Sequence, residues 1–267
     1  MVEKKLLEEM SWTEFVEARK ETDTVLIPTG SVEVEGYHLP LGVDSIVALE
    51  VAKRVAAGTK LLVAPLVSVT YSEWHMGFPG TLSIRLSTLT QVLREICDGL
   101  VEHGLRRIMF INSHVGNDPA IMEVAHELVR RSAARVGMVN LWGTANQMGK
   151  DIPELKEKVF LHAGEIMTSV MLALRPELVD MTKAQKEYVK ARIDSFVQKG
   201  SPQVTFKGIS AYAYHLSDEV TKSGVMGDPM AATKEKGEKI LSLWVDFIRD
   251  YVREFQKLPI EARTVSG

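Results

Sequence analysis

The residues best able to do chemistry gather in one short segment, GSVEVEGYHLPLGVD, which runs from Gly30 to Asp44. Glu33 and Glu35 are two positions apart, so in an extended chain both carboxylates project from one face. Two like charges held this close are costly unless a cation lies between them. Asp44 follows a proline-containing turn and adds a third carboxylate. The segment indicates either a metal site or a solvated acidic loop, and the two glutamates by themselves favour the loop.

Two further segments carry polar side chains of the kind that bind metals. His114 lies in NSHVGN, directly after the apolar run 108–111, and an Asn–His–Asn group is unusual for a plain turn. A single histidine is nevertheless more often structural than a ligand. In HAGE, His162 and Glu165 are three positions apart and share a face if the segment is helical. The alternative is a simple helix start, with Glu165 stabilised by the helix dipole. Taken together, the three segments supply both carboxylate and imidazole ligands.

The elements that must position these residues alternate along the chain. We expect strands at 24–29, 61–70, 108–111 and 136–141. We expect helices at 11–20, 46–57, 88–102, 118–134, 165–173 and 230–255, the first opened by the capping-box pattern SWTE. Such alternation predicts an α/β fold, one domain over 1–267, with a mainly parallel sheet covered by helices on both faces. Ligands bind such sheets at the carboxyl ends of strands, and Glu33 and His114 each follow a predicted strand.

Composition excludes several classes of protein. Basic and acidic residues number 32 and 35, a balance that argues against a nucleic-acid partner. No run approaches the roughly 18 apolar residues of a membrane span, so we expect no membrane partner. Residues 1–10 are rich in Glu and Lys and lack the apolar core of a secretory signal, so a cytoplasmic location is expected. The single cysteine, Cys97, cannot build a thiolate cluster and is predicted to lie in the core. Motifs for nucleotide binding and for a serine nucleophile are absent from the sequence.

The sequence resembles the creatininase family of metal-dependent amidohydrolases. The family pattern GSxEQHGxHLPLxxD reads GSVEVEGYHLPLGVD here, NGHGGN reads NSHVGN, and HAGExETS reads HAGEIMTS. YSEWHMGFPGTLS at 71–83 and GVMGDPMAATKEKG at 224–237 match two more family segments. The likeness runs in the family's order from about residue 25 to about residue 245. It implies a creatininase-like three-layer fold and a homo-oligomer, specifically a hexamer.

The resemblance also implies two divalent metal ions per chain, Mn²⁺ or Zn²⁺, with Mg²⁺ as a further candidate. Carried over position by position, the expected ligands are Glu33, Glu35, Asp44, His114 and Glu165, with Asp44 bridging the two ions. Position 35 is a histidine in the family pattern and Glu35 here. Creatininase itself uses a glutamate two residues after the second-motif histidine, and Gly116 occupies that position, which leaves Glu165 as the best remaining candidate. Four carboxylates balance two divalent ions, and oxygen-rich ligands favour Mn²⁺ or Mg²⁺ more than an all-histidine site would.

The same resemblance assigns a proton-transfer role to His162, since an imidazole of ordinary pKa titrates near neutral pH. Two metals about 3.5–4 Å apart hold a bridging water and lower its pKa, so that hydroxide attacks a polarised carbonyl. The glutamate of the family's Glu-Thr-Ser is Met167 here, so its role is lost or displaced. We further expect the substrate to contact His38, Tyr71 and Trp142.

The family acts on small polar molecules, among them creatinine, other cyclic amides and ring ketones of inositol breakdown. Creatinine itself is disfavoured by the three departures at Glu35, Gly116 and Met167. The variant pattern EVEGYH resembles the branch that hydrolyses 3-dehydro-scyllo-inosose, a cyclic diketone of inositol catabolism, by opening its ring. The alternatives are a cyclic amidohydrolase with a creatinine-like substrate and a metallopeptidase acting on small peptides. A binding module that has lost catalysis is the less favoured, non-enzymatic alternative.

Overall fold

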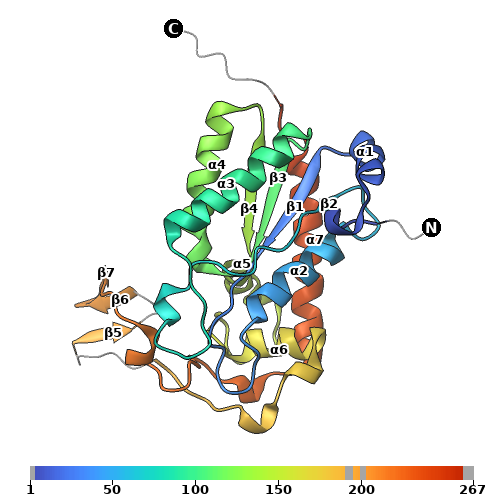
Figure 1. Ribbon diagram of the computed structural model, residues 1–267. Coiled ribbons are helices and arrows are strands. Elements are labelled where there is room, and N and C mark those ends of the chain that lie inside the picture. Colours follow the sequence, from blue (N-terminus) through green and yellow to red (C-terminus); the bar gives the residue numbers. More distant parts are fainter. Residues whose placement is uncertain (1–3, 190–194, 199–202, 261–267) are drawn as a thin grey trace.

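A four-stranded parallel sheet forms the centre of the computed structural model, which describes residues 4–189, 195–198 and 203–260 (Figure 1). Its strands, in the spatial order β2-β1-β3-β4, are β2 (Leu62–Val63), β1 (Thr24–Thr29), β3 (Arg107–Asn112) and β4 (Arg135–Asn140). Each neighbouring pair is parallel. Thr29, Asn112 and Asn140, the last residues of three strands, are in register, so the segments that follow them start side by side.

Helices cover both faces of this sheet, and side chains alternate between the two layers. Val25 and Ile27 of β1 pack with α3 (Leu86–Glu102) and α4 (Asp118–Arg131), whereas Leu26 packs on the opposite side. That opposite layer consists of α2 (Val43–Ala56), α5 (Leu141–Met148), α6 (Glu165–Leu174) and α7 (Lys234–Phe255). Figure 1 shows α3 and α4 on one side of the strands and α2 and α7 on the other. The strands are apolar throughout because both faces are buried, and the predicted α/β fold class is confirmed.

The expected elements are present, but several of their ends differ. The helix expected at 46–57 is α2 (Val43–Ala56), and the one expected at 118–134 ends at Arg131. The helix predicted at 11–20 is α1 (Trp12–Glu21), and Ser11 and Glu14 form the capping box. The run 61–70 is a strand only over two residues. Beyond them the Ala64 N–H donates to the Leu26 carbonyl and the Val67 N–H to the Pro28 carbonyl, so pairing with β1 continues only irregularly. The last helix begins at Lys234 rather than near 230, since Thr233 caps it by accepting a hydrogen bond from the Lys236 N–H. Cys97, a residue of α3, is buried on the side of that helix that faces the main sheet, as predicted.

Three features were not expected from the sequence. Helix α5 starts directly after β4, where the Asn140 side chain accepts from the Gly143 N–H. A second, antiparallel sheet has the order β5-β6-β7 and lies to the left of the main sheet in Figure 1. Its strands are β5 (Phe196–Gln198), β6 (Gln203–Phe206) and β7 (Ile209–Tyr212). Short 3-10 turns occur at Leu7–Glu9, Glu73–His75, Val115–Asn117, Gly149–Asp151, Pro176–Leu178, Met181–Lys183, Ser217–Glu219 and Pro229–Ala231. Among the described helices, none has both the length and the apolar character needed to cross a membrane.

The packing of α6 against α7 depends on Gly237 and gives a stability prediction. A Cβ atom at this position would lie 1.9 Å from the Ser169 carbonyl oxygen, so Gly237→Ala must push the two helices apart. We expect it to lower the free energy of unfolding by about 1–3 kcal/mol, although alanine is the better helix former. The matched control is Gly99→Ala within α3, where no atom lies within 4 Å and a gain of up to about 1 kcal/mol is expected. Urea unfolding measures both, and a Gly237→Ala protein as stable as wild type would contradict this packing.

Candidate metal centre

The carboxyl ends of β1 and β3 bring three buried side chains together. Glu33 follows β1, His114 follows β3, and Asp44 stands in the first turn of α2. His114 Nδ1 is 3.2 Å from Glu33 Oε2 and 3.2 Å from Asp44 Oδ2. The three residues each turn one potential ligand atom toward a common point, all within 4.8 Å of one another. The register of the strand ends is what places residues so distant in the chain beside each other.

The tautomer of His114 decides what this group can hold. Its Nε2 lies 2.8 Å from the Tyr71 carbonyl oxygen, which can only accept, so Nε2 donates. A neutral imidazole then turns the lone pair of Nδ1 toward two carboxylate oxygens, and only a proton or a cation relieves that repulsion. Burial by itself lowers the pKa of His114, but the charges of Glu33 and Asp44 outweigh burial and hold this pKa well above its usual value. Three converging acceptors of this kind fit a divalent cation.

Gly116 stands where creatininase itself has a glutamate, and its surroundings leave no space for a side chain. A Cβ atom at this position would lie 2.4 Å from His114 Nε2 and 2.5 Å from the Tyr71 carbonyl oxygen. Any larger side chain would therefore break the hydrogen bond that orients His114. The two asparagines of the motif are structural: Asn112 donates to Asp118 at 2.7 Å, and Asn117 donates to the Gly30 carbonyl at 3.0 Å.

Asp44 is held from two further directions. Ser31 Oγ donates to Asp44 Oδ2 at 3.0 Å, and Trp142 Nε1 donates to Asp44 Oδ1 at 2.8 Å. Burial raises the pKa of Asp44, as does the charge of Glu33, while the hydrogen bonds from His114 and Trp142 oppose that rise. Trp142 was expected to contact substrate, and it also lines the cavity described below. The Trp142 indole therefore also fixes the orientation of the Asp44 carboxylate.

A second group contains Glu33 with His75 and His162. His75 Nε2 is 3.5 Å from Glu33 Oε1, and the rings of His75 and His162 stack with centroids 4.6 Å apart. Sequence reasoning did not single out His75, which stands in the 3-10 turn Glu73–His75. The available signal was its place inside the family-like segment YSEWHMGFPGTLS. Burial lowers the pKa of His75 to about 3, which keeps the imidazole neutral and able to bind a metal.

Glu35 adjoins this second group and carries the clearest sign of a missing partner. The residue is 0% exposed, and neither of its carboxylate oxygens has a hydrogen-bond partner among the residues that the structure describes. Its Oε2 atom lies 3.3 Å from His162 Nε2. Burial raises the pKa of Glu35 well above its usual value, and the charges of Asp44 and Glu33 add to that rise. For Glu33, burial acts in the same direction, but the charge of His114 and its hydrogen bond outweigh burial and lower the pKa. An unsatisfied buried carboxylate beside two others fits the ligand shell of a cation.

Glu165, expected to be a ligand, lies outside both groups. Its Oε2 atom accepts from the N–H groups of Lys156 at 2.8 Å and Glu157 at 2.7 Å, and its Oε1 atom pairs with Lys236 Nζ at 2.5 Å. Both oxygens are therefore already satisfied by donors, and the ammonium balances the charge. The structure therefore does not place Glu165 among the potential ligands, and His75, with a ring nitrogen beside Glu33, enters that group instead. The reason is that His162 and Glu165 are not on one helix: α6 begins only at Glu165, and Ala163 adopts a left-handed φ of 51°.

The remaining predicted residues have different surroundings. His38 is buried, and its Nε2 lies 2.9 Å from Thr168 Oγ1. It is not among the residues that line the cavity, so the structure does not place it in contact with a substrate there. Tyr71 lines the cavity and orients His114 through its backbone carbonyl. Met167, in place of the family's glutamate, forms part of the cavity wall.

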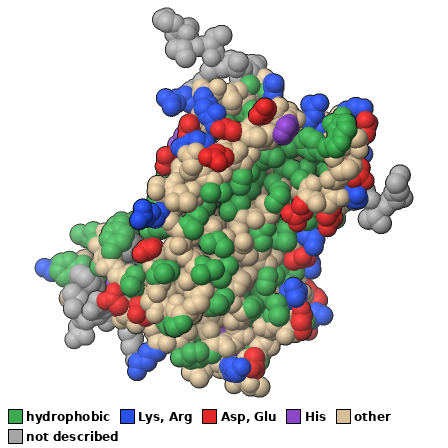
Figure 2. Space-filling view, viewed as in Figure 1, with side chains coloured by type: hydrophobic (Ala, Val, Ile, Leu, Met, Phe, Trp, Pro, Cys, Tyr) green, Lys and Arg blue, Asp and Glu red, His purple; other side chains and the backbone are tan. Residues whose placement is uncertain are grey.

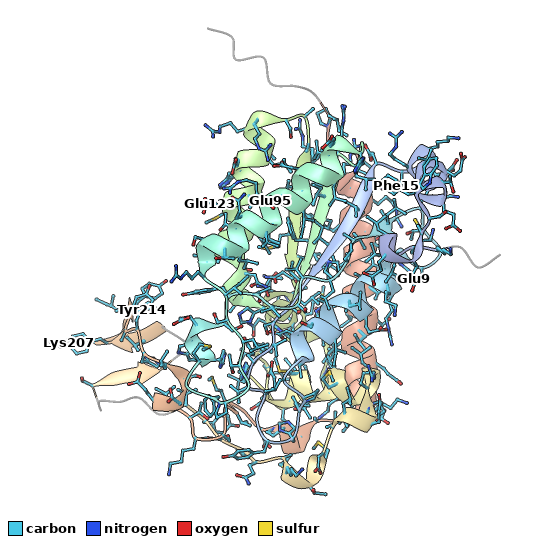
Figure 3. All side chains as sticks on the ribbon, in the orientation of Figure 1. Glu9, Phe15, Glu95, Glu123, Lys207 and Tyr214 are labelled. Carbon is cyan, nitrogen blue, oxygen red and sulfur yellow. The ribbon has the colours of Figure 1, made fainter. Side chains whose placement is uncertain are left out.

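A cavity of about 760 Å³ opens onto both groups of ligands. Its walls are largely aromatic and consist of Tyr71, Trp74, Trp142, Phe160, Tyr212 and Tyr214. Tyr214, labelled in Figure 3, follows β7 and stands at the small antiparallel sheet, which thus contributes to this wall. The charged groups are the carboxylates of Glu33, Asp44, Glu73 and Asp118, and the described lining residues include neither Lys nor Arg. The cavity therefore suits a compact ring better than an anion.

Fold and site together define the class: a metal-dependent hydrolase with an α/β fold, in which buried carboxylates and imidazoles lie at the carboxyl ends of parallel strands. The chain belongs to the creatininase family, whose sequence model, described as creatinine amidohydrolase, matches residues 8–252. Creatinine amidohydrolase of Pseudomonas putida is 31% identical over 263 residues, covering 92% of this chain and 95% of that protein. A solved structure of a manganese form of creatininase aligns with a TM-score of 0.79 at 28% identity, covering 94% of this chain and 98% of that one.

Other relatives have different named activities. The mycofactocin precursor peptide peptidase of Mycolicibacterium smegmatis is 31% identical over 245 residues, covering 87% of this chain and 85% of that protein. The 3-dehydro-scyllo-inosose hydrolase of Thermotoga maritima is 26% identical over 261 residues, covering 93% and 82% respectively. A zinc–zinc form of a creatininase variant also aligns, with a TM-score of 0.76 at 28% identity, covering 94% of this chain and 98% of that one. The similarities therefore span a cyclic amide, a peptide and a ring ketone as substrates of relatives.

The electrostatics of Glu35 give a prediction for the protein stripped of metal. Because the folded state raises this pKa above its ordinary value of 4.5, ionised Glu35 destabilises the fold as pH rises beyond that value. Metal-free Glu35→Gln should therefore melt about 2–8 °C higher than wild type at pH 7, and the difference should shrink as pH falls toward 4.5.

Saturating Mn²⁺ should reverse that order, since a ligand carboxylate is then stabilising. Thermal unfolding with EDTA and with Mn²⁺ provides both measurements. Equal melting temperatures for the two metal-free proteins at pH 7 would show that Glu35 has another partner.

Proposed function

We propose that this protein uses two divalent ions to hydrolyse a small, uncharged, polar ring at a carbonyl carbon. The most specific candidate substrate is 3-dehydro-scyllo-inosose, a cyclic diketone. The observation that carries the proposal is the convergence of His114 Nδ1, two carboxylates and the unpartnered oxygens of Glu35 beside one cavity. The manganese and zinc–zinc forms of related creatininases support the choice of metals.

The proposed ligands divide into two sets that share Glu33, whereas the family resemblance implied Asp44 as the bridging residue. One set is Glu33, Asp44 and His114, and the other is Glu33 with Glu35 and His75. The ions, when bound, activate water near neutral pH and polarise the substrate carbonyl. Trp142 and the Tyr71 carbonyl hold Asp44 and His114 in their orientations, so neither ligand reorganises during the reaction.

His162 is proposed to move the proton. Its side chain is 11% exposed and lines the cavity, and its Nε2 donates to the Val34 carbonyl at 2.8 Å. The same nitrogen lies 3.3 Å from Glu35 Oε2. An imidazole in this position reaches both the ligand shell and the cavity, so it can take a proton from water and deliver it to the leaving atom.

The cavity favours an uncharged ring over a peptide with a free carboxylate. Aromatic walls pack well against a flat ring, and the described lining residues provide carboxylates but no Lys or Arg to pair with an anion. In a 1,3-diketone, water adds to one carbonyl and the ring carbon–carbon bond breaks. The electron pair goes to an enolate that the second carbonyl stabilises, and a proton completes the product. A cyclic amide opens by the same addition, so a creatinine-like substrate is the second candidate.

A substrate panel tests the proposal. Protein loaded with Mn²⁺ or Zn²⁺ should carry about two ions per chain and open 3-dehydro-scyllo-inosose with a kcat/KM at least about 10²-fold above that for creatinine, 2-pyrrolidinone or short peptides. Elemental analysis and product detection by NMR supply the two measurements. Faster turnover of creatinine or of peptides would assign the protein to one of those activities instead. Two bound ions with no turnover of any compound would indicate a binding module.

The role of His162 has its own test. His162→Asn keeps a hydrogen-bonding group but cannot titrate, so turnover should fall roughly 10²–10⁴-fold while metal content stays near two ions. The matched variant His103→Asn changes a surface histidine at the end of α3 and should leave turnover unchanged. Loss of one ion in His162→Asn would make His162 a ligand, as its place in the second group of potential ligands also allows.

We also propose that the chain forms a homo-oligomer, for which the family resemblance suggests a hexamer. In Figure 2, hydrophobic side chains gather across the middle of the visible face, while charged side chains lie mainly toward its edges. An apolar surface of this kind is suited to contact with another protein chain. Sedimentation velocity on the metal-loaded protein measures the assembly, and a monomer at micromolar concentration would exclude it.

A further inference from the structure

The segment between α5 and α6 is closed on itself by two buried glutamates that exchange hydrogen bonds. Glu165 Oε2 accepts from the N–H groups of Lys156 and Glu157 at 2.8 and 2.7 Å. In return, Glu157 Oε2 accepts from the Glu165 N–H at 3.0 Å. Each carboxylate therefore holds the backbone of the other residue. The chain between them, 158–164, becomes a loop with fixed ends, and it carries His162 and the cavity residue Phe160.

A third residue places an opposite charge beside the Glu165 side chain in the interior. Lys236 Nζ lies 2.5 Å from Glu165 Oε1 and also donates to the Ala231 carbonyl at 2.7 Å. The two side chains are 12% and 0% exposed. A carboxylate this deeply buried is costly unless it is paired and fully hydrogen-bonded, and both conditions are met here. The ion pair ties the start of α6 to the first turn of α7.

The other oxygen of Glu157 extends the arrangement toward the C-terminal motif. Glu157 Oε1 accepts from the Asp228 N–H at 2.8 Å. Gly164 and Gly227 leave room for this carboxylate, since a Cβ atom on either would lie 2.7 or 2.8 Å from Glu157 Oε2. In the same stretch, the Met226 N–H donates to the His162 carbonyl at 2.9 Å. Gly164 of HAGE and Gly227 of GVMGDP thus allow the Glu157 carboxylate to lie close to the backbone.

We propose that Glu165, Glu157 and Lys236 form a positioning brace that fixes His162 for proton transfer. None of the three lines the cavity or belongs to either group of metal ligands. They act through the backbone: the brace sets both ends of the 158–164 loop, and the Met226 N–H fixes the His162 carbonyl itself. The backbone at Ala163, with its φ of 51°, is unfavourable for a residue with a side chain and persists only where its surroundings impose it. The role of the brace in catalysis rests on the proposed function of His162, whereas its role in holding the loop does not.

The test compares a buried ion pair with an exposed one between the same residue types. Glu165→Gln turns an amide NH₂ either toward the Lys236 ammonium or toward the N–H groups of Lys156 and Glu157, so in both orientations a donor faces a donor and the brace is weakened. The control is Glu154→Gln, which removes the partner of Lys239 in a pair whose side chains are 48% and 52% exposed. Hydrogen exchange measured by mass spectrometry should rise at least about ten-fold at 160–164 and at Met226 in Glu165→Gln. Glu154→Gln should leave exchange at these positions unchanged.

Kinetics then separate positioning from general destabilisation. Glu165→Gln should lower kcat about 10- to 100-fold, with KM within about three-fold of wild type and metal content unchanged. In a His162→Asn background, the same change should lower kcat less than about three-fold, because its effect passes through His162. The double variant Glu165→Gln/Lys236→Met, which leaves neither an unpaired ammonium nor an unpaired carboxylate, should restore kcat to within about three-fold of wild type. It also serves as the comparison if Glu165→Gln alone does not fold.

Three results would overturn the proposal: unchanged exchange at 160–164 and Met226, additive losses in the His162→Asn background, or loss of a metal ion from Glu165→Gln. The last would restore Glu165 to the ligand set. Failure of the proposed function would give a result different from these three. If wild-type protein turns over no compound of the panel, exchange at 160–164 and Met226 still decides whether the brace holds the loop, and unchanged exchange would reject it.

Discussion

The structure depends on keeping three carboxylates, Glu33, Glu35 and Asp44, close together in a buried site. Such an arrangement is unfavourable by itself, because burial and mutual repulsion both oppose ionisation. Much of the surrounding structure makes it tolerable. His114 and His75 turn ring nitrogens toward Glu33, and Trp142 and Ser31 donate to Asp44. What these contacts leave unsatisfied, above all the two oxygens of Glu35, matches what a pair of divalent ions would supply.

This constraint also explains why the family motifs contain residues of two kinds. Some motif residues reach the centre, as His114 does, while others keep those residues in place. Asn117 ties the second motif to Gly30, and Gly116 leaves space for the hydrogen bond that orients His114. Glu165 belongs to the second kind, because its carboxylate is already filled by two N–H groups and an ammonium. A motif residue of ligand type is therefore not evidence of ligation until its donors and acceptors have been accounted for.

The cavity adds a contribution from outside the motifs. Tyr212 and Tyr214 reach it from the small antiparallel sheet and the segment after it, and Trp74 reaches it from the turn beside His75. The proposed preference for uncharged rings rests on these aromatic walls and on lining carboxylates without Lys or Arg among the described residues. Relatives at about 30% identity are named for a cyclic amide and a peptide, and the named ring-ketone hydrolase is 26% identical.

The sequence determined the fold class and the carboxylate-rich part of the centre, because both are local properties. Alternating apolar runs predict strands and helices, and the segment from Gly30 to Asp44 places three carboxylates within fifteen residues. Only the tertiary structure shows that His75 lies beside Glu33 and that Glu165 does not. One is brought beside Glu33 by a loop between β2 and α3, and the other is turned away by a left-handed residue and captured by Lys236. The antiparallel sheet also escaped prediction, since its exposed strand β7 packs on no apolar core that would impose a pattern. The spacing of residues in the chain predicts which side chains share a local face. Which donors and acceptors those side chains contact depends on how distant segments pack together.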